Sequence, residues 1–316
     1  MGRKEKILAR IGKQDKGLEI APYHSPLAAR SEGYNVRILD VFDQAELKSR
    51  ALSDPLIPDE LVQSVEEVDY VGSATEIAKL IPTEEHASFD YIVSSHNFEH
   101  LANPIKFLQG CEVLLKQGGV LTMAVPDARA CFDYFRPRTV LGEWLEAYFQ
   151  DRQKPSHRQL FDSRAYMSFR RKGDQEQHAF HGDAGLSSMV LKGDISKEFE
   201  AWKARADDGP YEDAHCTVMT PETLRLLLTE AQMLGLVKLD IVEISAPIAH
   251  EFYVRLRKRD GGQKLEAHSK DGLLVRDGLL KKAMQFQYSS GPFARPRRLL
   301  NKLKRSIDKR LGRFGG

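Results

Sequence analysis

Short apolar runs alternate with polar, turn-rich or amphipathic stretches over the first 126 residues. The runs are brief and rich in β-branched and aromatic residues, as in the stretch FDYIVSS at residues 89–95. Parallel strands that are covered on both faces have this composition. We therefore predict five such strands, at residues 17–21, 36–40, 68–71, 89–95 and 119–125.

One helix, between the fourth and fifth predicted strands, is marked at both ends. Asn103 is suited to cap it, Pro104 occupies its first position, and Gly118 and Gly119 follow its last apolar residues. Strands that alternate with helices at this spacing predict an open, doubly wound α/β sheet with mostly parallel strands. Ligands of such sheets bind at the carboxyl ends of the strands, so we expect the functional residues in the loops that follow them.

The pattern changes after residue 126. Residues 127–215 are polar and aromatic without a strand period, and they are too many for a simple connection, so we predict a helical insertion. Thr220 and Pro221 then begin an apolar helix, and two later strands, at 237–244 and 252–256, form an antiparallel pair. The predicted division is a ligand-binding core (1–126), the insertion (127–215), a completion of the core (216–259) and a C-terminal extension (260–316), which includes a helix around Leu273 to Met284.

Composition narrows the class of protein. With 316 residues, of which 41% are hydrophobic and 29% charged, the chain matches a folded globular enzyme and not a disordered one. Its cysteines, Cys111, Cys131 and Cys216, are scattered and odd in number, which predicts neither a disulfide framework nor a cysteine-rich zinc site and favours the cytoplasm. No segment resembles a signal peptide or a membrane span.

The loop after the first predicted strand reads APYHSP and contains no glycine. A pyrophosphate clamp needs glycines for its tight turn and for the close approach of its backbone, so this loop argues against a nicotinamide dehydrogenase. Asp40 ends the second predicted strand, where the carboxylate of a nucleotide-binding βαβ unit accepts hydrogen bonds from ribose hydroxyls. Alternatively, Asp40 only begins the turn before Phe42.

Several segments resemble one branch of the class I, S-adenosylmethionine-dependent methyltransferases. The stretch LEIAP at residues 18–22, followed by Pro26, is similar to the first motif of that branch, LEIGP-x-x-x-P, except that Ala21 replaces glycine. Residues 89–101, FDYIVSSHNFEHL, and then LLKQGGVL at 114–121 and VPD at 125–127 resemble the unit around the fourth and fifth strands. The likeness covers residues 17–139 and 215–256 and implies a Rossmann-like fold with an antiparallel C-terminal strand pair.

The resemblance implies S-adenosylmethionine as the cofactor and assigns residues to each of its parts. It places the methionine moiety against Glu19, Ala21 and Tyr23, and the ribose on Asp40. It further places the adenine near Ser73 and Ala74, and the sulfonium near Ser95 and His96. Residues 1–126 would bind this cofactor, and the insertion at 127–215 would bind the substrate.

The expected catalytic residues are His96, His100 and Asp127. Methyl transfer to a hydroxyl requires removal of a proton, and His96 has the titration range of a general base, although its ring could instead only shape the loop. His100 lies four residues on and would face the same side of a helical turn. Glu99 directly precedes the second histidine, whereas the acid of zinc proteases directly follows the first, so no metal is predicted.

Arg136 and His215 are the expected contacts to an anionic or sugar acceptor. The alternatives are that Arg136 pairs with Asp133 and that Asp127 caps the next helix. The resemblance implies an enzyme that methylates a small or carbohydrate-linked acceptor at oxygen, in cell-surface polysaccharide metabolism. Two other functions stay open: a catalytically silent binding or assembly module, which would release no heat with S-adenosylmethionine or its demethylated product, and a sugar-nucleotide enzyme such as a glycosyltransferase.

The C-terminal segment carries a concentration of positive charge. Residues 293–316 contain nine Lys or Arg and one Asp, a local charge of +8 in a chain whose net charge is +2. Residues 298–311 place leucines and Ile307 on one helical face and basic residues around the other, which predicts attachment to an anionic membrane surface. The alternatives are packing on the core or on a partner subunit; RNA binding is disfavoured because aromatic residues are missing. Flotation with liposomes, compared with a truncation at Gly291, tests the membrane prediction.

Overall fold

The computed structural model describes residues 2–181, 185–206, 209–259 and 269–288. Its centre is a seven-stranded sheet in the order β3-β2-β1-β4-β5-β10-β9. Strands β1 to β5 are parallel, β10 runs antiparallel to β5, and β9 runs antiparallel to β10. The predicted fold class, a mostly parallel doubly wound sheet with an antiparallel C-terminal pair, is confirmed. The strands are β1 (Gly17–Ile20), β2 (Val36–Asp40), β3 (Tyr70–Val71), β4 (Phe89–Ser95), β5 (Leu115–Pro126), β9 (Leu239–Ile244) and β10 (Glu251–Lys258).

Two layers cover the sheet because successive strand residues point to opposite faces. Leu18 and Ile92 face one apolar cluster, which includes helices α5 and α9, whereas Tyr91 and Val93 face a second cluster against the N-terminal helix α1. The α-helices of the core are α1 (Arg3–Ile7), α2 (Gln44–Ser53), α3 (Asp59–Val62), α4 (Ile77–Leu80), α5 (Pro104–Leu114) and α9 (Pro221–Met233). Short 3-10 helices are η1 (Arg30–Glu32), η2 (Ala74–Glu76), η3 (Thr83–Glu85), η4 (Phe98–His100) and η5 (Leu186–Ser188).

The carboxyl ends of the three central strands are level with one another. Ile20 at the end of β1 pairs with Leu39 of β2 and with Ser94 of β4. The next residue of each strand, namely Asp40, Ala21 and Ser95, therefore follows at the same edge of the sheet. Adjacent strands lie about 4.8 Å apart, so these three positions form a short row.

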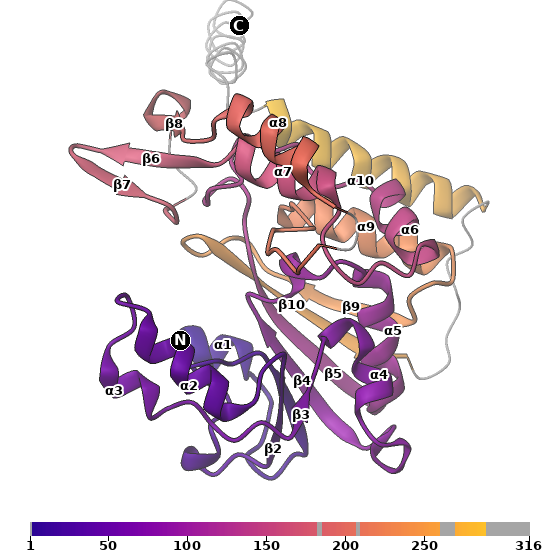
Figure 1. The fold of residues 1–316 in the computed structure, drawn as a ribbon. Coiled ribbons are helices and arrows are strands. Elements are labelled where there is room, and N and C mark those ends of the chain that lie inside the picture. Colours follow the sequence, from indigo (N-terminus) through magenta and orange to yellow (C-terminus); the bar gives the residue numbers. More distant parts are fainter. Residues whose placement is uncertain (1, 182–184, 207–208, 260–268, 289–316) are drawn as a thin grey trace, which may run out of the picture.

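The insertion contains helices, as predicted, together with a small antiparallel sheet. Its helices are α6 (Leu141–Phe149), α7 (His157–Ala165) and α8 (Ile195–Ala204), and its sheet has the order β7-β6-β8, with β6 (Ser168–Lys172), β7 (Gln175–Gln177) and β8 (Met189–Leu191). Figure 1 shows the insertion at the end of the molecule away from α2 and α3. These three strands were not predicted from the sequence.

Backbone hydrogen bonds join the two ends of the insertion. Ala128 N donates to Met219 O at 2.9 Å, and Thr139 N donates to Val218 O at 2.9 Å. We call residues 127–139 and 215–219 the neck. Because both segments of the neck are hydrogen-bonded, the chain leaves and re-enters the core at one place.

After the core, helix α10 (Lys270–Tyr288) lies alongside α9, where Arg276 pairs with Glu230 at 2.6 Å (Figure 1). This helix includes the one predicted around Leu273 to Met284. The basic segment 298–311 lies outside the described residues, so its predicted membrane attachment stays a prediction. Within the part of the chain that the structure describes, no helix combines the length and apolarity required to span a bilayer.

Candidate functional site

A cavity of about 810 Å³ opens beside the carboxyl ends of β1 and β2. Small-molecule sites are typically about 300–1,000 Å³, so the volume suits a nucleoside-sized ligand. Three predicted cofactor contacts, Ala21, Tyr23 and Asp40, line this cavity together. Its other wall comes from the segment that follows β2 and from α2, with Val41, Phe42, Glu46, Leu47, Ser49, Arg50, Ser53, Asp54 and Pro55.

The loop after β1 has an unusual backbone conformation. Ala21 and Tyr23 both adopt the left-handed region with a φ of 49°. Residues other than glycine rarely do so, because the Cβ approaches the following carbonyl oxygen. Ala21 thus holds the conformation that a glycine would take at this position of the LEIGP motif. The substitution keeps the shape of the loop at a cost of about 1–2 kcal/mol.

We predict that Ala21→Gly raises the free energy of unfolding by roughly 0.5–1 kcal/mol, because the strain removed exceeds the extra chain entropy of glycine. Chemical denaturation measures this. The matched control is Ala29→Gly, at a residue with an ordinary φ of −60°, which should instead lose stability. Equal losses in both variants would contradict the strain at Ala21.

Glu19, a predicted contact of the methionine moiety, holds the loop itself. Its carboxylate accepts hydrogen bonds from Leu27 N at 2.7 Å and Ala28 N at 2.9 Å, and the residue is 2% exposed. Burial raises the pKa of this carboxyl to about 7, although the two backbone donors oppose the shift. Glu19 therefore positions the loop that carries Ala21 and Tyr23.

The raised pKa of Glu19 predicts a pH dependence of stability. The folded state binds the Glu19 proton more tightly than the unfolded state does. The contribution of protonated Glu19 to the free energy of unfolding therefore falls as the pH rises from about 4.5 to about 7. In Glu19→Gln this decline, roughly 2–3 kcal/mol, should be absent. Urea denaturation at pH 5 and pH 7 measures the difference between the two proteins. A decline as large in the variant as in the wild type would refute the prediction.

Asp40 and the residues after β3 differ in how far they approach the cavity. Asp40 ends β2, is 4% exposed and accepts from Val41 N through Oδ1 at 2.7 Å, and burial raises the pKa of its carboxyl. Ser73 caps η2 through a bond from Thr75 N, and Ala74 is buried. Neither Ser73 nor Ala74 is among the residues that line the cavity, and their contact with adenine stays a prediction.

Ser95 and His96, at the end of β4, are held by charged residues from distant parts of the chain. Arg3 of α1 donates to Ser95 Oγ at 2.7 Å and pairs with Glu251 at 2.8 Å. His96 Nε2 lies 2.8 Å from Glu251 Oε2, and its Nδ1 lies 3.3 Å from Glu99 Oε1. Its φ of 49° also places this residue in the left-handed region.

The surroundings of His96 do not suit a general base. Burial lowers the pKa of the imidazole, but Glu251 and Glu99 outweigh it and raise the pKa to about 9. The ring therefore carries its proton at neutral pH and can donate hydrogen bonds but not remove a proton. The catalytic role expected for His96 stays a prediction, and the raised pKa of its ring argues against it.

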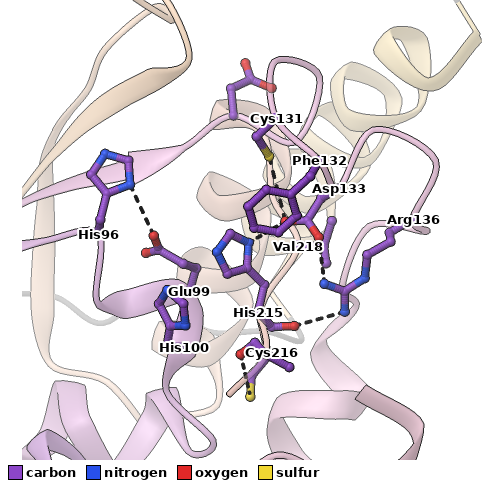
Figure 2. Close-up of polar contacts among 12 residues, drawn as sticks. His96, Glu99, His100, Cys131, Phe132, Asp133, Arg136, His215, Cys216 and Val218 are labelled. Atoms are coloured by element: carbon purple, nitrogen blue, oxygen red, sulfur yellow. Dashed lines mark hydrogen bonds and ion pairs between the residues drawn. The ribbon is translucent and has the colours of Figure 1, made fainter. Parts of the chain in front are cut away.

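A second group of residues gathers just beyond His96. Glu99 and His100 of η4 lie close to His215, which is the last residue of the insertion. Ligand atoms of all three residues lie within 4.8 Å of one another. Figure 2 shows Glu99 next to the rings of both histidines. The backbone explains the meeting, because Cys216 N and Thr217 N donate to Glu99 O at 2.6 and 3.0 Å. We call Glu99, His100 and His215 the cluster.

Buried partners orient the two histidines of the cluster. His215 Nδ1 bonds to Asp133 Oδ2 at 2.5 Å, and His100 Nδ1 bonds to Asp213 Oδ1 at 2.9 Å. Arg136 pairs with Asp133 at 2.7 Å and donates to His215 O at 2.9 Å (Figure 2). The guanidinium of Arg136, a predicted acceptor contact, is thus occupied within the protein, as the alternative stated.

Asp127, the third expected catalytic residue, is likewise engaged by its neighbours. It is 1% exposed, accepts from Arg129 N at 2.9 Å and pairs with the Arg129 guanidinium at 2.6 Å. The alternative that Asp127 caps the next helix is wrong, because turns follow Asp127 and the next helix, α6, begins at Leu141. The catalytic role of Asp127 stays a prediction. His100 and His215 stay as predicted site residues.

Sequence analysis overlooked two acids of the site, Glu99 and Glu251. Glu99 entered the sequence analysis only through its position next to His100, and Glu251 was not among the predicted site residues. A signal for Glu99 was present, because it stands between the apolar residues Phe98 and Leu101 on an otherwise buried segment. Nothing in the sequence pattern connects Glu251 to the end of β4, because that contact arises only through the pairing of β10 with β5.

A comparison with known protein families identifies the class of this protein. The model of a protein family described as "Methyltransferase domain" matches residues 5–233, which is most of the chain. The chain belongs to this family. It is an enzyme, a methyltransferase that uses S-adenosylmethionine as its methyl donor.

Among solved structures, this methyltransferase is similar in fold to a putative S-adenosylmethionine-dependent methyltransferase from Listeria monocytogenes, with 11% identity over 81% of this chain and 97% of that one and a TM-score of 0.41. It is also similar to a methyltransferase from Aquifex aeolicus, with 14% identity over 81% and 90% of the two chains and a TM-score of 0.39. No curated protein sequence matches it.

The residues at the cavity fit this cofactor. S-adenosylmethionine contains no phosphate, so a loop without a glycine clamp is sufficient, and the Asp40 carboxylate has the acceptor chemistry that a ribose diol requires. When bound, the cofactor supplies an electrophilic methyl group on a sulfonium. The protein supplies the alignment for an in-line displacement.

Proposed function

We propose that this methyltransferase methylates a hydroxyl oxygen of a small or carbohydrate-linked acceptor that binds against the cluster. The observation that supports this most is Glu99, whose side chain is fully buried and whose two carboxylate oxygens accept no hydrogen bond. Glu99 Oε1 has only the 3.3 Å ion contact with His96. A carboxylate beside two imidazoles offers acceptors for the O–H groups of a polyol.

In this proposal the two halves of the site have separate tasks. Asp40 holds the ribose, Ala21 and Tyr23 contact the methionine moiety, and Glu19 fixes their loop. Ser73 and Ala74 lie toward the adenine, and Ser95 lies toward the sulfonium because it is level with Ala21 at the sheet edge. The insertion supplies His215 and the wall of the acceptor site.

The biological setting forms part of the proposal. The resemblance to enzymes of cell-surface polysaccharide metabolism favours a sugar acceptor. The basic segment 298–311 would bring the enzyme to an anionic membrane, where lipid-linked glycans are assembled.

Incubation with isotopically labelled S-adenosylmethionine tests the proposed acceptor class. We would offer sugar nucleotides and oligosaccharides in one panel and amines of similar size in another, and follow methyl incorporation by mass spectrometry. The label should enter the carbohydrate panel, and NMR of the product should place it on oxygen. Incorporation into amines alone would exclude the proposed acceptor. Asp40→Ala provides the background without bound cofactor.

A further inference from the structure

We propose that Glu99, His100 and His215 form a binding site for a divalent transition-metal ion of the Zn²⁺ type. The three residues offer two imidazole nitrogens and one carboxylate oxygen whose ligand atoms lie within 4.8 Å of one another. Three protein ligands of this kind leave further coordination positions free, as in catalytic zinc sites and in two-histidine, one-carboxylate iron sites. An all-oxygen site would instead suit Mg²⁺ or Ca²⁺.

The orientation of both imidazole rings supports the site. Each ring uses its Nδ1 toward a carboxylate, Asp213 for His100 and Asp133 for His215. A neutral histidine that donates Nδ1–H to a carboxylate presents an unprotonated Nε2, and this arrangement accompanies most metal-ligating histidines. Among the described residues, neither Nε2 has a hydrogen-bond partner. The ring centroids lie 4.7 Å apart and the rings are nearly perpendicular, at 87°.

Glu99 provides the second, independent observation. Its side chain is 1% exposed, yet neither carboxylate oxygen accepts a hydrogen bond. Leaving a buried ionised group without such bonds is costly, and each instance in a folded protein requires an explanation. A cation held between Glu99 and the two imidazoles would add to the His96 contact and supply the partner that the second carboxylate oxygen, Oε2, lacks. The amides of Cys216 and Thr217 fix the Glu99 backbone, so the ligand geometry is set before an ion arrives.

The neighbouring group of His96, His250 and Glu251 is a weaker candidate, although its ligand atoms also lie close together. The carboxylate of Glu251 is already saturated, because Arg3, His96 and Tyr253 all bond to it. An ion there would have to displace these partners. The sequence analysis paired His96 with His100, whereas the structure pairs His100 with His215.

An ion in the cluster would have a direct use in methyl transfer, and this part of the inference rests on the proposed function. A divalent ion polarises an oxygen ligand and lowers its pKa. It would therefore favour loss of the proton from an acceptor hydroxyl.

The test measures ion binding and not activity. Tag-free enzyme is freed of metal with a chelator and titrated with Zn²⁺ by calorimetry, and Co²⁺ is added separately to follow its visible absorption. Wild type should bind one ion per chain. Glu99→Gln and His100→Ala should each weaken binding at least about 10-fold, and Asp213→Asn, which removes the carboxylate charge beside His100, should weaken it by about 10-fold. The matched control, His250→Gln, removes a histidine of the other group and should bind normally.

Three outcomes would overturn the inference: no Zn²⁺ binding by wild type, unchanged binding in both Glu99→Gln and His100→Ala, or loss of binding in His250→Gln. Binding of S-adenosylmethionine by each variant verifies that it is folded, and His100, whose side chain is 30% exposed, provides a substitution that should preserve the core if Glu99→Gln unfolds. Methylation of sugars without ion binding would leave the proposed function intact and remove the metal site. Ion binding without methylation of sugars would do the reverse.

Discussion

Replacing Asp40 by alanine should raise the Kd for S-adenosylmethionine at least about 100-fold. The Asp40 carboxylate ends β2 on the wall of the 810 Å³ cavity and sits beside Ala21 at the level edge of the sheet. A charged acceptor contributes about 1.5–3 kcal/mol for each hydrogen bond, and a ribose diol forms two of them. Since about 1.4 kcal/mol corresponds to a factor of ten, the loss of both bonds gives the expected change.

Calorimetric titration with S-adenosylmethionine and with its demethylated product measures the effect. Both ligands carry the same ribose, so both should lose affinity equally. Asp59→Asn, at an exposed acid of α3, is the matched control and should bind as the wild type does. An Asp40→Ala protein with unchanged affinity would show that the cofactor does not use this cavity.

Replacing Asp133 by alanine should lower the free energy of unfolding by about 3–5 kcal/mol, because it leaves a buried charge without its partner. The side chains of Asp133 and Arg136 are 2% and 4% exposed and pair at 2.7 Å, and Asp133 also holds His215. Burial raises the pKa of the Asp133 carboxyl, but His215 and Arg136 outweigh burial and hold it well below its usual range. The contribution of the ionised Asp133 carboxylate to the free energy of unfolding is thus complete above about pH 4 and is lost as the pH falls.

Urea denaturation at pH 7 and at pH 3 tests both parts of this prediction, and the difference between wild type and Asp133→Ala should shrink at the lower pH. The double variant Asp133→Leu with Arg136→Met replaces the pair by apolar side chains of similar volume, and should be more stable than Asp133→Ala. If the double variant were less stable than Asp133→Ala, an unpaired buried Arg136 could not be the cause of the stability that Asp133→Ala loses.

The core strands were predictable because their apolar runs are continuous and locally determined. β4 begins and ends where its sequence predicts, at Phe89 and Ser95. β3 is shorter than predicted, since the Asp69 carboxylate instead accepts from Ile38 N and pairs with Arg30 and Arg37. The strands of the insertion gave no such signal: β6 contains Arg170, Arg171 and Lys172, and its small sheet buries too few side chains to impose an alternating pattern.

The same distinction applies to the site. Ala21 and Asp40 lie at strand ends, and strand ends can be located from sequence, so their meeting at one cavity was predictable. The cluster could not be predicted in this way, because Glu99 and His215 are separated by the whole insertion and meet through backbone bonds of Cys216 and Thr217. The proton on His96 likewise depends on Glu251, which reaches it from β10.

The neck has a consequence for how this enzyme can diversify. Residues 140–214 leave and return through two segments that are bonded to each other, and the returning segment is anchored on Glu99. A different stretch of chain could replace this one between the anchor points while the cavity beside β1 and β2, Glu99 and His215 kept their places. Evolution could then change the acceptor molecules that the insertion admits, without changing the residues of the reaction site.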